Sequence, residues 1–204
     1  MKKGLKQKGL RKQKLTPQEV VSAAKLRRYL GIDPNKCDAI IVCDGSGSVW
    51  DATEASRGIG WGAKLMLSNS VESVDFWGSA SSGTNNAAEI LALLHPLLYL
   101  EQLEAGIKED GCQVHVVTDS QYVAGIVNSN LLKRLHTIEK NLMLWYAVFG
   151  ATRSGLVLTA HHVGREDLAV QKLAHDLSHF SRVGRWRPSQ QPKLAKKLRE
   201  WDEG

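Results

Sequence analysis

The segment Val116-Val117-Thr118-Asp119-Ser120-Gln121-Tyr122-Val123 joins an apolar, β-branched run to a helical pattern. The run Gln113–Val117 has the length and composition of a short strand. Ser120–Asn128 has the periodicity of a helix, which leaves Asp119 at the junction. In α/β folds such junctions hold ligands, because binding sites form beyond the carboxyl ends of the strands. The stretch therefore predicts an α/β fold with Asp119 at a candidate site.

Outward from this junction, the sequence predicts three strands before it and a strand with further helices after it. Three consecutive strands followed by alternating helices and strands predict a mixed sheet, antiparallel on one side and parallel on the other. Pro96 falls inside the long predicted helix and predicts a kink or a break there. The other predicted elements are the strands Ala39–Cys43, Gly58–Leu67, Ser73–Ser79 and Leu156–Thr159, and the helices Thr16–Tyr29, Asn86–Gly106, Leu131–Phe149 and Asp167–Phe180.

Two further carboxylates occupy positions comparable to that of Asp119. Asp44 follows the strand Ala39–Cys43 and opens a Gly-rich turn, and Glu89 lies near the start of the long helix. If the strands before Asp44 and Asp119 are parallel neighbours, the three acids meet at one edge of the sheet. Carboxylates so close stay ionised only beside a cation, and hard oxygen ligands favour Mg²⁺ or Mn²⁺. The three acids together predict a metal-dependent site, although each alone also fits a cap or turn residue.

Three segments carry a resemblance to a known family. They are Cys43-Asp44-Gly45-Ser46, Gly83-Thr84-Asn85-Asn86-Ala87-Ala88-Glu89-Ile90-Leu91-Ala92 and Val117-Thr118-Asp119-Ser120-Gln121-Tyr122-Val123. In order, spacing and predicted secondary structure they resemble the three N-terminal motifs of type 1 ribonuclease H. The resemblance implies a ribonuclease-H-like five-stranded mixed sheet flanked by helices. It also implies endonucleolytic hydrolysis of the RNA strand of RNA–DNA hybrids by a two-metal-ion mechanism, with Mg²⁺ as the cofactor and Mn²⁺ as an alternative.

The resemblance also implies roles for individual residues. The family's catalytic, metal-binding acids match Asp44, Glu89 and Asp119. Contacts to nucleic acid are implied for Gly45, Ser46, Asn85, Asn86 and Gln121. Amide side chains suit such contacts because they both donate and accept hydrogen bonds, and the ribose 2′-OH that distinguishes RNA from DNA does the same.

The chain departs from the family's pattern in the last motif. The match places His161 on the family's flexible loop, as a catalytic candidate for proton transfer, with His162 as the competing candidate. It also places the neutral Gln171 where the family has a fourth metal-binding Asp. Asp167 lies four residues earlier, so on a helix it faces the same way and is a candidate metal ligand. The chain is therefore either an active nuclease or a weakened or inactive nucleic-acid-binding module of a nucleoprotein assembly.

Basic residues concentrate at the two ends of a chain whose net charge is +6. Residues 1–36 hold 11 basic and two acidic residues, and residues 182–204 hold seven and three, whereas residues 37–181 carry a net charge of −7. This division predicts a basic N-terminal extension with a short helix, a ribonuclease-H-like domain and a basic C-terminal tail. The low-complexity segment 1–15 is expected to be disordered in isolation.

The basic ends are candidates for holding the hybrid, other nucleic acid or a nucleoprotein complex. Lys2–Lys14 and Arg182–Arg199 can neutralise phosphates, and Trp186, between two arginines, can stack on a base or sugar. Asn128–Leu142 holds three basic residues and no Trp, so the basic protrusion found in many family members is expected to be reduced. Each tail is also consistent with a solubilising segment.

Composition excludes several other classes of protein. Hydrophobic residues make up 43% and charged residues 24%, which fits a globular protein rather than a disordered or collagen-like one. The three cysteines Cys37, Cys43 and Cys112 form no Cys-x-x-Cys motif, which favours the cytoplasm or another reducing intracellular compartment over secretion. No apolar run reaches the roughly 20 residues of a membrane span, so no membrane partner is expected.

Overall fold

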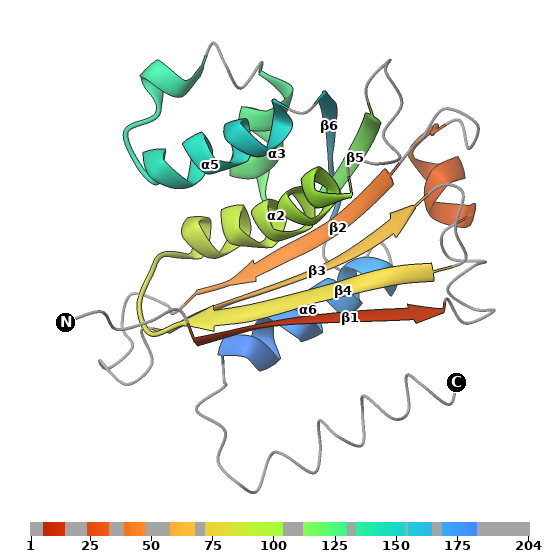
Figure 1. Cartoon of the computed structure of the whole chain (residues 1–204), viewed down its shortest axis with the longest axis horizontal. Coiled ribbons are helices and arrows are strands. Elements are labelled where there is room, and N and C mark those ends of the chain that lie inside the picture. The colour runs from red at the N-terminus through yellow and green to blue at the C-terminus, as the bar shows by residue number, and fades with distance from the viewer. Residues whose placement is uncertain are drawn as a thin grey trace, which may run out of the picture.

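The computed structural model describes residues 6–14, 24–32, 39–47, 58–67, 72–103, 112–129, 134–153, 155–164 and 169–182. There the chain forms one six-stranded sheet in the order β1-β4-β3-β2-β5-β6, with helices on both faces (Figure 1). The strands are β1 (Lys6–Lys14), β2 (Ala39–Ser46), β3 (Ile59–Leu67), β4 (Glu72–Ala80), β5 (Cys112–Thr118) and β6 (Leu156–His162). The helices are α2 (Asn85–Gln102), α3 (Gln121–Asn128), the 3₁₀ turn η3 (Leu135–Thr137), α5 (Leu142–Thr152) and α6 (Ala169–Arg182). Within these ranges, no helix has both the length and the apolarity that crossing a membrane requires.

The strand directions confirm the predicted mixed sheet. β2, β3 and β4 form an antiparallel meander, whereas β5 pairs in parallel with β2 on one side and with β6 on the other. The five strands expected from the family resemblance are therefore present, and β1 is added to them beyond β4. Because β2, β5 and β6 are parallel neighbours, their carboxyl ends lie at the same end of the sheet.

Alternate residues of β2 pack into two separate cores. Ile41 and Cys43 belong to the larger core, which also includes side chains of α2, α3 and α5. Ile40 and Val42 point to the opposite face, into a smaller core with Ala174 of α6 and with Leu26. The central strand is thus buried on both faces, which fits its continuous apolar sequence.

Glycines let the helices approach the strands at the end of the sheet where Asp44 lies. A Cβ atom on Gly45 would lie 2.3 Å from the backbone nitrogen of Glu89, so the start of α2 crosses β2 in direct contact. On the other face, a Cβ atom on Gly62 would lie 2.6 Å from the carbonyl oxygen of Ala174 in α6. The backbones of both helices therefore lie in direct contact with the backbone of the sheet beside Asp44.

The start of α2 is capped by Thr84, and Pro96 does not end the helix. Thr84 accepts a hydrogen bond from the backbone nitrogen of Ala87 at 3.1 Å through its side-chain oxygen. The helix continues without a break through Pro96 to Gln102. Pro96 itself is buried, and the helix tolerates the loss of one backbone donor there.

The N-terminal segment contains a strand that the sequence did not predict, over Lys6–Lys14. β1 pairs antiparallel with β4, with Leu10 opposite Phe76 and Lys14 opposite Glu72. The expectation of disorder concerns the segment in isolation and stays a prediction. In Figure 1 this red strand lies along the outer side of β4. The β4 edge supplies backbone hydrogen-bond partners that the isolated segment lacks, and this pairing stabilises the strand.

Two of the predicted helices are also changed. The helix predicted over Leu131–Phe149 is interrupted, because Asn141 adopts a left-handed conformation with φ of 59° directly before α5. Of the helix predicted over Thr16–Tyr29, the described residues 24–29 are helical, and the first part lies outside the described ranges. Gly31, with φ of 64°, follows this helix and allows the chain to turn back.

Candidate active site

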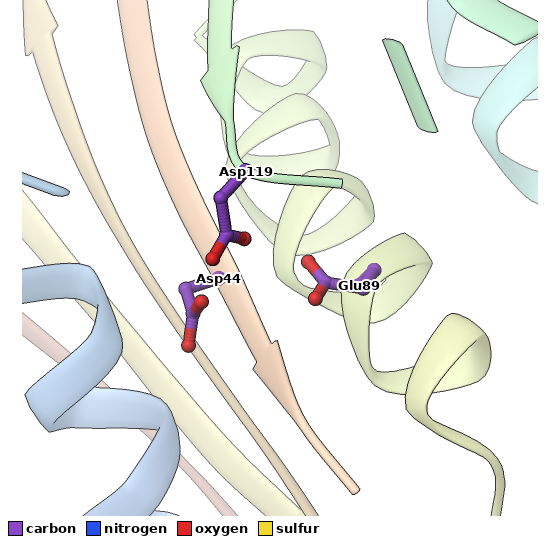
Figure 2. A group of neighbouring side chains, drawn as sticks. All are labelled: Asp44, Glu89 and Asp119. Atoms are coloured by element: carbon purple, nitrogen blue, oxygen red, sulfur yellow. The ribbon is translucent and has the colours of Figure 1, made fainter. Parts of the chain in front are cut away.

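Three carboxylates meet at the carboxyl end of the parallel strands. Asp44 comes from β2, Glu89 from the second turn of α2, and Asp119 from the residue that follows β5. One oxygen atom of each lies within 4.8 Å of the others, and Figure 2 shows the three side chains directed toward a common space. The structure thus brings together the three acids that the sequence singled out.

Two side chains of α6 hold one oxygen of Asp44. Ser178 Oγ donates a hydrogen bond to Asp44 Oδ2, and His175 Nδ1 lies 3.2 Å from the same oxygen. The other oxygen, Oδ1, is buried and has no hydrogen-bond partner within the described residues. Asp44 itself is fully buried. The side chain is therefore fixed from one side, with a free oxygen on the other.

A divalent cation fits this arrangement of oxygen atoms. A fully buried carboxylate oxygen without a donor is costly unless a positive charge compensates it. Asp44 Oδ1 meets this description, and Glu89 and Asp119 bring further carboxylates within 4.8 Å. Oxygen ligands of this kind are those that Mg²⁺ and Mn²⁺ prefer. The donor set therefore suits a hard cation.

The first turn of α2 is tied to the loop that follows β2. Asn85 Oδ1 accepts a hydrogen bond from the backbone nitrogen of Gly47 at 2.8 Å, and Asn85 Nδ2 donates to Glu89 Oε1 at 3.4 Å. Arg182, the last residue of α6, donates to the carbonyl oxygen of Gly47. Gly47 is thus held from both faces of the sheet, and Asn85 also orients Glu89.

Gln171 is fully buried beside this site. Its Nε2 donates to the backbone carbonyl oxygen of Cys43 at 3.2 Å, directly before Asp44. Its Oε1 is buried without a hydrogen-bond partner among the described residues. Gln171 thus places a neutral amide next to Asp44, where the resemblance led us to expect a carboxylate.

His161 and His162 are adjacent in the sequence, but their side chains have different neighbours. His161 lies inside β6 rather than on a loop, and its Nε2 is 2.8 Å from Nδ1 of His115 on the neighbouring strand. Burial lowers the pKa of His161, and the nearby His115 lowers it further. His162 ends β6, is exposed, and has its Nε2 3.2 Å from the backbone oxygen of Asp119. Of the two candidates, His162 is the one in contact with an acid of the cluster.

The remaining predicted residues are distributed around the cluster or lie outside the described part of the chain. Gly45 and Ser46 are the last residues of β2, and Asn86 and Gln121 lie in the first turns of α2 and α3. Gln121 is exposed at the same end of the sheet as Asp119, whose strand it follows. Asp167 and Trp186 fall outside the described ranges, so their assignment remains a prediction.

Sequence reasoning did not assign His175 and Ser178 to this site. They lie four and seven residues after Gln171, which is the spacing of one helical face. That spacing was a usable signal, but it does not say which face of α6 packs on Asp44. The electrostatic effect of the cluster reaches Cys43, because burial and then the neighbouring Glu89 and Asp44 raise the pKa of its thiol well above the usual value.

Solved structures with low sequence identity share this fold. The N-terminal RNase H domain of a Mycobacterium tuberculosis protein, solved as a fusion with maltose-binding protein, superposes with a TM-score of 0.55 at 17% identity. That match covers 72% of this chain and 94% of the other. LC9-RNase H1, described as a type 1 RNase H with the type 2 active-site motif, gives 0.53 at 18% identity and covers 74% of each chain.

The native protease-reverse transcriptase of prototype foamy virus gives a TM-score of 0.57 at 18% identity, over 74% of this chain and 21% of the viral one. No curated protein matches the chain. The RNase H family model matches residues 36–159, which is more than half of the sequence and contains Asp44, Glu89 and Asp119. The chain therefore belongs to the RNase H family of nucleases.

Proposed function

We propose that the protein is a metal-dependent endoribonuclease that hydrolyses the RNA strand of RNA–DNA hybrids. The observation that carries the proposal is the convergence of Asp44, Glu89 and Asp119 within 4.8 Å at the carboxyl ends of β2 and β5. The protease-reverse transcriptase of a foamy virus, one of the structural neighbours, was solved with an RNA/DNA hybrid and with double-stranded DNA. This neighbour supports a nucleic-acid substrate for the same fold.

Mg²⁺ or Mn²⁺ would be held by the three carboxylates, with Gln171 Oε1 as an additional neutral donor. When bound in pairs, such ions lower the pKa of water and stabilise the leaving oxygen of a phosphodiester. The second ion of a pair needs negative charge, and Gln171 provides one charge fewer than a carboxylate would. The substrate phosphate would then supply part of the charge that balances two cations.

The protein's own side chains would select and orient the substrate. Asn85, Asn86 and Gln121 carry amides around the acidic cluster, and an amide can both donate to and accept from a ribose 2′-OH. His162 lies against the backbone oxygen of Asp119 and is exposed, so its ring can exchange protons with solvent. We assign His162 to proton transfer near the leaving oxygen.

The test is cleavage of an RNA–DNA hybrid by the full chain with Mg²⁺, with Mn²⁺ and with chelator. We expect cleavage of the RNA strand with either cation, none with chelator, and none in the Asp119→Asn variant. Duplex DNA, duplex RNA and single-stranded RNA serve as comparison substrates. Failure to cut the hybrid with both cations would overturn the proposal, and faster cutting of another substrate would change its substrate class.

A second candidate function is a ribonuclease-H-like module that binds nucleic acid without cutting it. The neutral, fully buried Gln171 favours it, because a cluster with fewer charges binds cations less tightly. This candidate predicts salt-sensitive binding of the hybrid with no turnover in Mg²⁺ or Mn²⁺. The cleavage assay therefore separates the two functions directly.

A further inference from the structure

The strand β1 combines a high positive charge with an edge position in the sheet. Its sequence, Lys-Gln-Lys-Gly-Leu-Arg-Lys-Gln-Lys, contains five basic residues and no acidic one. It pairs with β4 on one side, and in the described part of the chain the sheet ends there. Its outer side therefore presents backbone groups of a strand rich in basic residues, of which Lys12 and Lys14 are exposed.

β1 begins at the same end of the sheet as the acidic cluster. In register, Lys6 lies opposite Ser79, Ser79 opposite Gly60, and Gly60 opposite Ser46, two residues after Asp44. Three strand spacings separate β1 from β2, a distance of about 14 Å. A duplex bound at the acidic cluster has a width of this order, so its flank can reach the strand.

The side of β1 that faces α2 has the mixed character of a nucleic-acid contact. Lys12 and Lys14 are exposed, and Lys12 Nζ lies 5.9 Å above the ring of Tyr99 in α2. Leu10, 49% exposed, lines a hollow of about 220 Å³ with Trp77 and Tyr99. Phosphates require cations, whereas sugars and bases present apolar faces, and this surface offers partners for both.

We propose that β1 is a substrate-binding arm that contacts the sugar–phosphate backbone of the RNA–DNA hybrid where the duplex extends past the catalytic cluster, since Lys12 and Lys14 lie toward the opposite end of the sheet from Asp44. The inference rests on the proposed function for its substrate. Protection of the sheet edge against self-association is the competing explanation, since charged residues on edge strands prevent pairing between molecules. Charged residues of either sign would protect an edge strand, whereas those of β1 are all basic. Protection of the edge also does not account for the aromatic hollow next to the strand.

The test compares two triple variants of the full chain that remove the same charge. Lys14 and Arg11 lie opposite the acidic residues Glu72 and Asp75, so the β1 variant changes the other three lysines. It is Lys6→Gln with Lys8→Gln and Lys12→Gln. The control changes exposed cations of other elements, in Lys25→Gln with Arg28→Gln and Arg153→Gln. Both are made in the non-cutting Asp119→Asn background, and hybrid binding is measured over a range of salt concentrations.

We expect the β1 variant to bind the hybrid at least about tenfold more weakly, with the slope of log K against log salt reduced by about two to three. The control should change neither quantity by a comparable amount, and replacing the same three lysines by arginine should retain binding. Equal losses in the β1 variant and the control would overturn the proposal. A β1 variant that binds the hybrid normally but self-associates on a sizing column would also overturn it. Polyglutamate that displaces the hybrid from the unmodified chain as well as a free hybrid does would indicate an acidic protein partner instead, and would likewise overturn the proposal.

The binding measurement is independent of turnover. If the unmodified chain binds the hybrid through β1 but cuts no substrate, the arm is retained and the proposed nuclease function fails. If the chain cuts the hybrid but the β1 variant and the control bind it equally well, the nuclease function is retained and the proposed arm fails. Thermal unfolding of all variants checks that the loss of binding does not come from loss of the strand.

Discussion

Gln171 donates a side-chain amide hydrogen to the backbone carbonyl oxygen of Cys43, at 3.2 Å. Because a carbonyl oxygen only accepts hydrogen bonds, this contact orients the amide with Nε2 toward Cys43 and Oε1 away from it. Oε1 is buried and has no partner in the part of the chain that the structure describes. Because this contact fixes the amide beside the residue that precedes Asp44, we expect Oε1 to act as a neutral ligand when a cation binds.

Replacing Gln171 by Met tests this role, since Met has a similar volume but no oxygen or amide. We expect Gln171→Met to weaken binding of Mg²⁺ and Mn²⁺ by about tenfold or more, within the range found for loss of groups that support metal sites. Gln171→Glu should strengthen it by adding a negative charge. Titration calorimetry without substrate measures both, with exposed Lys172→Met as the control. Unchanged affinity in Gln171→Met would limit Gln171 to packing.

Ser178 is expected to position Asp44 through its hydroxyl. Ser178→Ala removes a donor to the buried Oδ2, at a cost in unfolding free energy of about 1–3 kcal/mol. It should also lower kcat, because Asp44 loses one of the two α6 side chains that fix Oδ2 and is held from that helix by His175 alone. The matched control is Ser181→Ala, whose hydroxyl bonds only to the carbonyl oxygen of Leu177 among the described residues. Urea unfolding and hybrid cleavage separate the two effects, and similar kcat values in both variants would contradict the positioning role.

The two histidines of β6 should respond differently to substitution. His162→Ala removes the ring next to Asp119, and we expect kcat to fall by about 100-fold or more, as for loss of a general acid. His161→Ala leaves that ring in place and disrupts the contact with His115 instead, so it should change stability more than kcat. Initial rates on a hybrid substrate with saturating Mg²⁺ provide the comparison. The opposite ranking would return the catalytic role to His161.

The stability of the fold should depend on pH through His115 and His161. Burial lowers the pKa of both below the usual 6.5, so the folded state favours their neutral forms. The unfolded chain therefore binds more protons, and the stability from these groups is complete above pH 6.5 and is lost as the pH falls toward their folded values. Two protonated rings also cannot keep the 2.8 Å contact. Denaturant unfolding measured from pH 7.5 to pH 5 should show a smaller loss of stability in His115→Gln than in the unmodified chain.

Gly45 is expected to tolerate no side chain. In Gly45→Ala the new methyl group would lie 2.3 Å from the backbone nitrogen of Glu89, so α2 must shift away from β2. We expect a loss of about 1–3 kcal/mol in stability, together with a loss of cation binding because Glu89 moves. Gly125→Ala is the control, since a Cβ there meets nothing within 4 Å and replaces a helical glycine. We expect Gly125→Ala to raise the free energy of unfolding by about 0.5–1 kcal/mol.

The core of the fold was predictable where local pattern and tertiary environment agree. β2 and β5 are apolar because they are buried between layers, and their ends place Asp44 and Asp119 together as parallel neighbours must. The strand β1 was not predictable, because its polar sequence gains order only from the edge of β4. Asn141 shows a third case, since the helical pattern predicted over Leu131–Phe149 gave no sign of a left-handed residue between two helical segments.

The site was predictable in its acids but not in its supporting contacts. Strand ends fix the positions of Asp44 and Asp119 closely, whereas the packing of α6 decides which of its side chains reach Asp44. His175 and Ser178 make those contacts, and their spacing alone leaves the rotation of the helix open. Likewise, adjacent residues of a strand point to opposite faces, so His161 and His162 could be distinguished only once β6 was known to include both.

Because β1 completes the sheet beside β4, the boundary chosen for expressing the nuclease domain matters. A shortened protein that starts after residue 36 would retain every residue of the acidic cluster, yet it would expose the outer hydrogen-bonding groups of Glu72–Ala80. An uncovered strand of this length is a template for pairing between molecules. Such a fragment should be prone to aggregation, and its low yield or low activity would reflect the lost strand rather than an inactive site.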